Sequence, residues 1–242
     1  MENHKGTCLM GLSKESIEKA FKKVTPDNLP EELELKLLTN DMQNDAVLFM
    51  KQNFVAHEPL IHLFDVQWDE DTEKYWRAVF DHGMTLVLTS KIRGEIISIR
   101  AIDIVRKTDK VKTTNVADER LRNLLEYLNY CDDNANFFEH YGTDAAVHFS
   151  GLAVSESYRR RGIATLLLKC AVELIETLGL ESVHIKGEAS SDYSKKIYEK
   201  FGFEMLFEQM YEDYRVNGKQ VISNIGVHKT NKIYGKTVTC LK

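Results

Sequence analysis

The stretch VHFSGLAVSESYRRRGIATLLLKCAVELIETLG, residues 147–179, decides the fold of this chain. Its apolar beginning, 147–154, predicts a strand, and a polar turn at 155–161 follows it. From Ile163 to Leu178, apolar residues recur at i, i+3, i+4, i+7 and i+8, which is the spacing of one helix face. The glycine directly after this run is a natural helix end. The stretch therefore predicts a strand, a basic turn and an amphipathic helix in direct succession.

The turn between this strand and helix is suited to bind an anion. The first backbone N–H groups of a helix have no partner inside the helix, and the helix dipole adds partial positive charge there. Arg159, Arg160 and Arg161 add cationic charge, and Gly162 lets a ligand approach the backbone closely. Neither a Walker A sequence nor a G-x-G-x-x-G fingerprint is present. From the residues alone, the turn is either a pyrophosphate site or a solvated arginine cluster.

The flanking sequence predicts a mixed sheet with helices on both faces, an α/β (mixed α+β) fold. Further strands are expected at 33–38, 84–90, 95–104, 182–185, 205–211 and 236–241. Helices are expected at 71–82, 117–130 and 190–201, and after a cap at Asn40 or Asp41. The basic run 105–116 is expected to be a solvated loop, and Asn217-Gly218 signals a turn.

Composition bounds the class of protein. The chain has 242 residues, of which 43% are hydrophobic and 29% charged, so it can bury a core without a metal or disulfide. The net charge of −5 argues against general nucleic-acid binding. Four widely spaced cysteines predict buried or incidental thiols in a reducing compartment and no zinc site. The start lacks a signal-peptide pattern and no long apolar run exists, so a cytoplasmic protein without a membrane span is expected.

The beginning of the chain differs from the rest. Residues 1–25 are polar, with a short amphipathic piece around Ile17, Ala20 and Phe21. We interpret them as an N-terminal extension, with a single domain over 26–242.

Two motifs resemble the GNAT acyltransferases. Residues 159–164 read Arg-x-x-Gly-x-Ala, which is similar to the family's Arg/Gln-x-x-Gly-x-Gly/Ala signature. Residues 194–203 read Ser-x-x-x-Tyr-x-x-x-Gly-Phe, which resembles the family's helix ending in Tyr-x-x-x-Gly-Phe. Several further segments resemble the insect-type arylalkylamine N-acetyltransferases: Phe54 with Glu58-Pro59-Leu60, Asn136-Phe137-Phe138, Glu188-Ala189-Ser190-Ser191, and Tyr211-x-Asp213-Tyr214 with His228.

The resemblance implies a GNAT fold, in which a seven-stranded mixed sheet splays near strand 147–154, and acetyl-CoA as the co-substrate, without a metal. The pantetheine arm is then expected to bond to backbone groups of Leu152, Ala153 and Val154. The remaining residues expected to bind the cofactor are Arg159, Arg160, Arg161, Gly162, Ile163, Ala164, Thr165 and Ser191.

Acetyl transfer to an amine sets requirements on the site. A primary amine has a pKa near 10, by analogy with lysine, and only its deprotonated form attacks a thioester. The resemblance implies Glu58 as the base, acting through bound water; without it, a helix-capping or surface carboxylate is the simpler interpretation. Ser190, Ser194 and Tyr198 have i, i+4, i+8 spacing, which predicts one line of hydroxyls on a helix face. The resemblance implies that this line relays or donates a proton to the leaving thiolate, since Tyr198 matches the family's general-acid tyrosine and the two serines match a serine pair of the insect-type enzymes. Alternatively, Ser190 or Ser191 is the helix cap and Tyr198 packs in the core.

The acceptor side is less defined. The resemblance implies that His228 lines the amine pocket, although a lone histidine is more often structural. His140, His148 and His184 are expected to be core or edge residues. An aromatic pocket and a plain core both remain open for a set of five aromatic residues: Phe64, Trp68, Tyr75, Trp76 and Phe138.

The resulting hypothesis is a monomeric, acetyl-CoA-dependent N-acetyltransferase. Its partners would be coenzyme A and a small arylalkylamine of the dopamine, serotonin, tyramine and octopamine class, whose nitrogen attacks the thioester directly. Alternatives are an enzyme for polyamines or other alkylamines, one that uses longer acyl-CoA donors, and a GNAT module that binds CoA without turnover. A nucleic-acid adaptor is disfavoured by the acidic composition.

Overall fold

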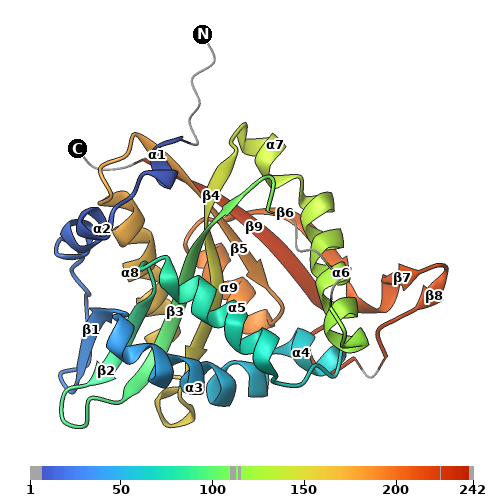
Figure 1. The fold of residues 1–242 in the computed structure, drawn as a ribbon, viewed down its shortest axis with the longest axis horizontal. Coiled ribbons are helices and arrows are strands. Elements are labelled where there is room, and N and C mark those ends of the chain that lie inside the picture. Colours follow the sequence, from blue (N-terminus) through green and yellow to red (C-terminus); the bar gives the residue numbers. More distant parts are fainter. Residues whose placement is uncertain (1–6, 110–112, 114–115, 224, 240–242) are drawn as a thin grey trace.

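The computed structural model describes residues 7–109, 113, 116–223 and 225–239. Within them, the chain forms a seven-stranded mixed sheet in the order β1-β2-β3-β4-β5-β9-β6, with helices on both faces (Figure 1). The predicted fold class is confirmed.

The main sheet consists of β1 (Leu33–Leu37), β2 (Leu86–Ser90), β3 (Ile96–Arg106), β4 (Ala145–Val154), β5 (Ser182–Ala189), β6 (Glu204–Met210) and β9 (Thr230–Thr239). A small ribbon, β7 (Arg215–Val216) and β8 (Lys219–Gln220), turns at Asn217-Gly218 as predicted. The helices are α1 (Thr7–Met10), α2 (Lys14–Phe21), α3 (Gln43–Asn53), α4 (Pro59–Leu63), α5 (Glu70–Asp81), α6 (Glu119–Ala135), α7 (Phe137–Tyr141), α8 (Ile163–Glu176) and α9 (Asp192–Lys200).

The sheet opens between its two central strands. β4 and β5 are parallel and pair only from Val147↔Ile185 to Phe149↔Gly187. Beyond this last rung, β4 continues to Val154 and pairs only with β3, so one backbone edge of 150–154 faces away from any strand described. This is the splay expected near strand 147–154, and the interval in which β4 and β5 are no longer paired, beyond Phe149 and Gly187, is called the slot below.

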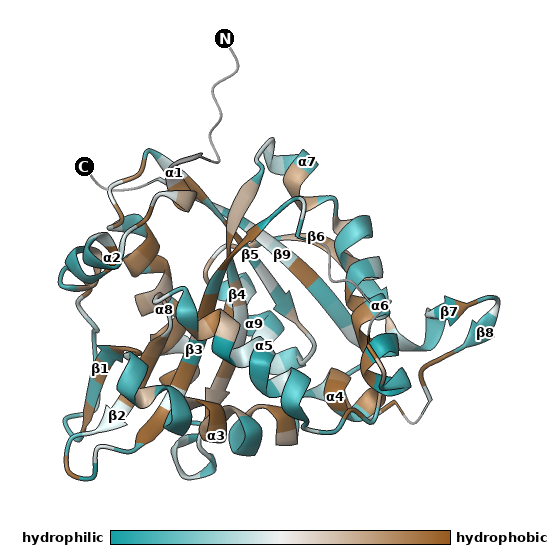
Figure 2. Ribbon diagram, in the orientation of Figure 1, coloured by the Kyte–Doolittle hydropathy of each residue, from teal (hydrophilic) through white to brown (hydrophobic). Residues whose placement is uncertain are grey.

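Apolar side chains hold helices against each face of the sheet. On one face, α8 and α9 pack through a cluster that includes Phe149, Leu167 and Tyr198. On the other face, α3 and α5 pack through Trp76 (Figures 1 and 2). Trp76 lies so close to β4 that a Cβ on Gly151 would be 2.8 Å from its ring. Glycine at that position is therefore a packing requirement.

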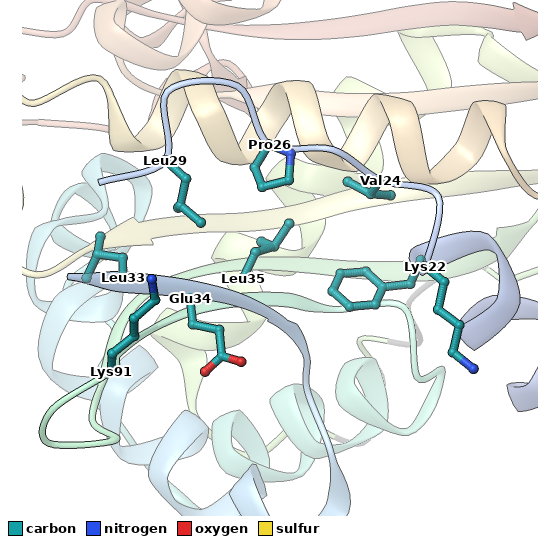
Figure 3. A pocket seen from close by; sticks show the side chains of 9 residues that line it. Lys22, Val24, Pro26, Leu29, Leu33, Glu34, Leu35 and Lys91 are labelled. Atoms are coloured by element: carbon teal, nitrogen blue, oxygen red, sulfur yellow. The ribbon is translucent and has the colours of Figure 1, made fainter. Parts of the chain in front are cut away.

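The N-terminal segment packs on the same core. Ile17 and Ala20 are buried in the cluster around α8, and the Thr177 hydroxyl of the α8 C-cap donates to the Ala20 carbonyl at 3.1 Å. The amphipathic piece forms the helix α2 over Lys14–Phe21. Residues 1–6 lie outside the described part, and the boundary between 1–25 and 26–242 stays a prediction. A cavity of about 370 Å³ lies between this segment and β1 (Figure 3), lined by Phe21, Lys22, Val24, Pro26, Leu29, Leu33, Glu34, Leu35 and Lys91. None of these residues is a predicted site residue.

Some element boundaries differ from prediction. α9 begins at Asp192, not at 190, because Ser191 caps it by accepting the Ser194 N–H. β5 extends past the predicted 182–185 to Ala189. The prediction missed this part because it is polar and lacks the apolar alternation of a half-buried strand. The short helices α4 and α7 were not predicted. In the basic run, 110–112 and 114–115 lie outside the described residues, as do 240–242. Among the described helices, none is long and apolar enough to cross a bilayer.

Candidate active site

The turn after β4 presents an uncapped helix start. Arg160 has φ +62° and Gly162 has φ +79°, so the chain reverses sharply before α8. Gly162 is the N-cap and offers no side chain to bond the first N–H groups, and the first turn has no acidic residue. A Cβ added to Gly162 would meet no atom within 4 Å, so the space in front of these N–H groups is open. The turn has the geometry of a pyrophosphate site.

Two of the three arginines brace this turn. The Arg159 Nε donates to the Val154 carbonyl at 3.1 Å, which fixes the turn to the end of β4. Arg161 stacks over the Tyr158 ring at 4.9 Å and lies 3.8 Å from a Glu32 oxygen. The arginines are therefore not a uniformly solvated cluster.

The end of β4 offers a partly free backbone edge. The Ser98 hydroxyl donates to the Ala153 carbonyl at 2.6 Å, and the Ser155 N–H donates to Ile97 on β3 at 2.9 Å. Since backbone groups alternate in direction along a strand, Leu152 and Val154 direct theirs toward the slot. The predicted pantetheine contact therefore rests on Leu152 and Val154 more than on Ala153.

Glu58 lies at a helix start on the far side of the slot. Its backbone is extended, with φ −78° and ψ 123°, as the following proline predicts. Its Oε2 accepts the Ile61 N–H at 2.7 Å, so the carboxylate caps α4. Burial raises the pKa of Glu58, while the neighbouring Ser190 hydroxyl and the α4 N–H groups lower it. The half-buried carboxyl group of Glu58 therefore both caps α4 and has a raised pKa.

The three predicted hydroxyls do not share one helix face. Ser190 precedes α9, and its carbonyl accepts the Tyr211 hydroxyl at 2.8 Å. Ser194 lies within the first turn, and its hydroxyl contacts both the hydroxyl and the carbonyl of Ser191 at 2.9 Å. The prediction that Ser190 lies on the same helix as Ser194 was wrong, because α9 starts two residues after Ser190. Ser190 instead points its hydroxyl to Glu58, and the cap is Ser191, the alternative left open by the sequence.

Tyr198 is buried at the splay. Its ring stacks on Tyr234 with centroids 5.1 Å apart, and its hydroxyl accepts a bond from Arg100 Nη2 at 2.7 Å. A Cβ on Gly187 would lie 2.5 Å from the Tyr198 ring, so this strand glycine makes room for the tyrosine. Arg100 and Gly187 were missed by the sequence analysis. The signals were present: a lone arginine in the apolar strand IISIRAIDI and an isolated glycine in a strand.

The opposite side of β4 and β5 carries several ionisable groups. His148 Nδ1 lies 3.1 Å from Asp103 Oδ1, and Ser150 donates to the same carboxylate. Lys186 Nζ lies 2.6 Å from Asp132 on α6. Tyr75 on α5 is 47% exposed, but its hydroxyl end is enclosed among these groups, and burial raises its pKa. This polar wall was not predicted, because its residues come from five separate elements.

Glu188, on β5, also belongs to this wall and has a raised pKa. It receives a hydrogen bond from the Asn231 side-chain amide on β9. Burial raises the pKa of Glu188 to about 7, and the charges of Asp132 and Glu58 act in the same direction. The amide nitrogen of Asn231 donates that bond, and the amide oxygen is buried without a partner among the described residues.

His228 and the aromatic candidates take mostly structural positions. The His228 Nδ1 accepts the Asp192 N–H at 3.2 Å, at the start of α9, and its role in lining an amine pocket stays a prediction. Trp76 and Phe64 belong to buried clusters. In the described residues, no group of three histidine, cysteine, aspartate or glutamate side chains could hold a metal ion.

Comparison with known proteins agrees with this geometry. Residues 103–217 match the model of the acetyltransferase (GNAT) domain. The chain is 30% identical over 88 residues to GCN5-related N-acetyltransferase 6, chloroplastic, of Arabidopsis thaliana, covering 35% of this chain and only 29% of that protein.

Two solved structures share the fold over most of the chain. Arylalkylamine N-acetyltransferase 2 from Aedes aegypti superposes with a TM-score of 0.79 at 20% identity, covering 86% of this chain and 100% of that one. A Drosophila melanogaster polyamine N-acetyltransferase, described as forming N-acetylagmatine, gives a TM-score of 0.76 at 14% identity over 84% and 99%. At these identities the likeness establishes the fold alone.

Proposed function

We propose that this chain, which contains a GNAT acetyltransferase domain and has the fold of the insect arylalkylamine N-acetyltransferases, transfers an acetyl group from acetyl-CoA to a small primary amine. The observation that carries the proposal is the continuity of the slot. β4 leaves β5 after Phe149 and runs directly to the uncapped start of α8. A diphosphate bound at that helix start would place a pantetheine arm along 150–154 and its thioester at the split.

Glu58 is the proposed base. An ammonium must lose a proton before its nitrogen attacks the thioester carbon, and a carboxylate with a raised pKa accepts that proton more readily. Ser190 beside it orients the carboxylate or a bridging water. The new C–N bond forms as the C–S bond breaks, and the departing thiolate takes a proton from Tyr198, whose hydroxyl lies at the split.

Arylalkylamines are the first proposed acceptors. The support is the fold shared with mosquito arylalkylamine N-acetyltransferases, together with the half-exposed aromatic side chain of Tyr75, whose hydroxyl lies among the polar wall residues.

Amines with a second cationic group are a second candidate. Asp103, Asp132 and Glu188 lie around the acceptor side, with Lys186 and His148 as the nearby basic groups. Carboxylates in a partly enclosed site attract a second ammonium or guanidinium. The fold shared with a polyamine N-acetyltransferase supports the same class.

A panel of amines tests the proposal. Arylalkylamines, diamines and agmatine are each offered with acetyl-CoA, and CoA release is measured. We expect one of these classes to dominate kcat/KM, and Glu58→Gln to lower kcat by roughly 10²–10⁴-fold at pH 7, with partial recovery at alkaline pH. The exposed Glu181→Gln is the matched control.

Three results would contradict parts of the proposal. CoA binding without turnover of any amine would identify a binding module. A pH-independent loss in Glu58→Gln would make Glu58 a positioning residue. Faster release of CoA from longer acyl-CoA thioesters than from acetyl-CoA would change the assigned donor.

A further inference from the structure

Arg100 is a buried cation that forms no ion pair with a carboxylate in the described part of the chain. The side chain is 2% exposed, and its Nε has no hydrogen-bond acceptor among the described residues. Its Nη2 donates a hydrogen bond to the neutral phenol of Tyr198, at 2.7 Å. Asp103, three residues along β3, acts on Arg100 through its charge and without a hydrogen bond. Since a buried unpaired charge is costly, a purely structural role is a poor explanation for this arginine.

The position of Arg100 is tied to the split between β4 and β5. Its guanidinium lies 4.4 Å from the centre of the Phe149 ring, and Phe149 pairs with Gly187 in the last rung of the two strands. Tyr198 covers Gly187 from α9. The Arg100–Tyr198 pair therefore lies at the point where the strands separate.

Among the groups that act on the Tyr198 hydroxyl, Arg100 is the one that favours a negative charge on its oxygen. Burial raises the pKa of Tyr198, the Arg100 guanidinium lowers it, and Glu188 on β5 raises it. Asp103 on β3 adds negative charge near Arg100 itself. Arg100 is therefore the cation that compensates a phenolate at this place.

We propose that Arg100 is a positioning residue for the leaving group, which holds the Tyr198 hydroxyl at the split and stabilises the phenolate formed when Tyr198 protonates the CoA thiolate. This rests on the proposed acetyl transfer. As the C–S bond breaks, the electron pair stays on sulfur, and the Tyr198 O–H proton moves to it. The phenolate remains bonded to the Arg100 N–H and regains a proton from solvent. Nothing is oxidised or reduced in the step.

Three substitutions separate charge from hydrogen bonding. Arg100→Lys keeps the charge, Arg100→Gln keeps a donor without charge, and Arg100→Met keeps only bulk. We expect kcat to fall about 10–10²-fold in the Gln and Met variants and less in the Lys variant. This is part of the roughly 10²–10⁴-fold that general acid catalysis contributes, because Tyr198 itself is retained. The KM for acetyl-CoA should change less than twofold. The exposed Arg106→Met on the same strand is the control.

A double-mutant cycle tests whether Arg100 acts through Tyr198. In a Tyr198→Phe background, Arg100→Gln should cause no further loss of kcat. An equal loss in both backgrounds, or an unchanged kcat in Arg100→Gln, would overturn the proposal. The Gln variant is used here because it remains informative if the Met variant does not fold.

Binding of free CoA distinguishes this inference from the proposed function. Calorimetry in buffers of different ionisation enthalpy counts the protons released on binding. Wild type should release more protons than Arg100→Gln, because the guanidinium bonded to the Tyr198 oxygen favours a negative charge on the pair formed by the phenol and the CoA thiol. This result supports the inference even in a chain that acetylates no amine tested. Equal release would overturn it, and a wild type that binds no CoA would overturn both proposals.

Discussion

Glu188 shows how a single residue can make the stability of this protein depend on pH. Its pKa is raised to about 7 from the ordinary value of 4.5, first by burial and then by the Asp132 charge. Between these two pH values the folded chain holds a proton that the unfolded chain has lost. Since the folded state binds more protons, its stability falls as the pH rises through this window.

Glu188→Gln should remove this dependence. Glutamine has no charge to bury, and its side-chain oxygen can still accept the bond from Asn231. As the pH rises from 5 to 8, we expect the unfolding free energy of the variant to increase relative to that of wild type by on the order of 1–3 kcal/mol. Urea unfolding at both pH values measures the change. Parallel pH curves for variant and wild type would contradict the assigned acidity, and the exposed Glu181→Gln is the control.

The start of α8 is the element on which cofactor binding depends. Gly162 has φ +79°, a conformation that costs other residues about 1–2 kcal/mol, while the space before it is open. A small and a large side chain at position 162 therefore cause the same backbone strain, but only the large one blocks the N–H groups.

Gly162→Ala and Gly162→Trp form the corresponding pair. Both should lose about 1–2 kcal/mol of unfolding free energy, because both require the left-handed conformation. Only tryptophan should block the approach of a diphosphate, so we expect the KM for acetyl-CoA to rise at least about tenfold in that variant alone. Steady-state kinetics and urea unfolding measure the two effects. An unchanged KM in Gly162→Trp would remove the turn from the proposed cofactor site.

At the level of the whole molecule, the N-terminal segment contributes to the same core as the sheet. Ile17 is 3% exposed and belongs to the cluster that surrounds α8. The backbone and side chain of Thr25 also donate to Glu173 of α8, both at 3.1 Å. These contacts predict that the segment and the sheet unfold together.

Ile17→Ala should therefore lower the stability of the entire chain. Removing a buried isoleucine costs about 2–5 kcal/mol, and we expect one cooperative thermal transition at a lower Tm. The neighbouring exposed Glu18→Ala should change stability by less than about 0.5 kcal/mol. Calorimetry follows both variants. A main transition that Ile17→Ala leaves unmoved would indicate that residues 1–25 fold apart from 26–242.

The sequence by itself determined the features that depend on neighbouring residues. The periodicity of 163–178 predicted α8, the polar run 155–161 predicted the turn before it, and the proline after Glu58 predicts its extended backbone. These features follow from local sterics and from the 3.6-residue repeat of a helix. The start of α9 was two residues off because adjacent serines are equally good caps.

Only the tertiary structure decided which distant groups meet. Arg100 and Tyr198 are separated by 98 positions, and Asn231 and Glu188 by 43, yet each pair is in contact. The raised pKa values of Glu58 and Glu188 likewise arise from burial. Burial and strand pairing depend on how all seven strands of the described sheet assemble. Spacing along the chain carries no information about these contacts, so they became visible only once β3, β5, β9 and α9 were placed together.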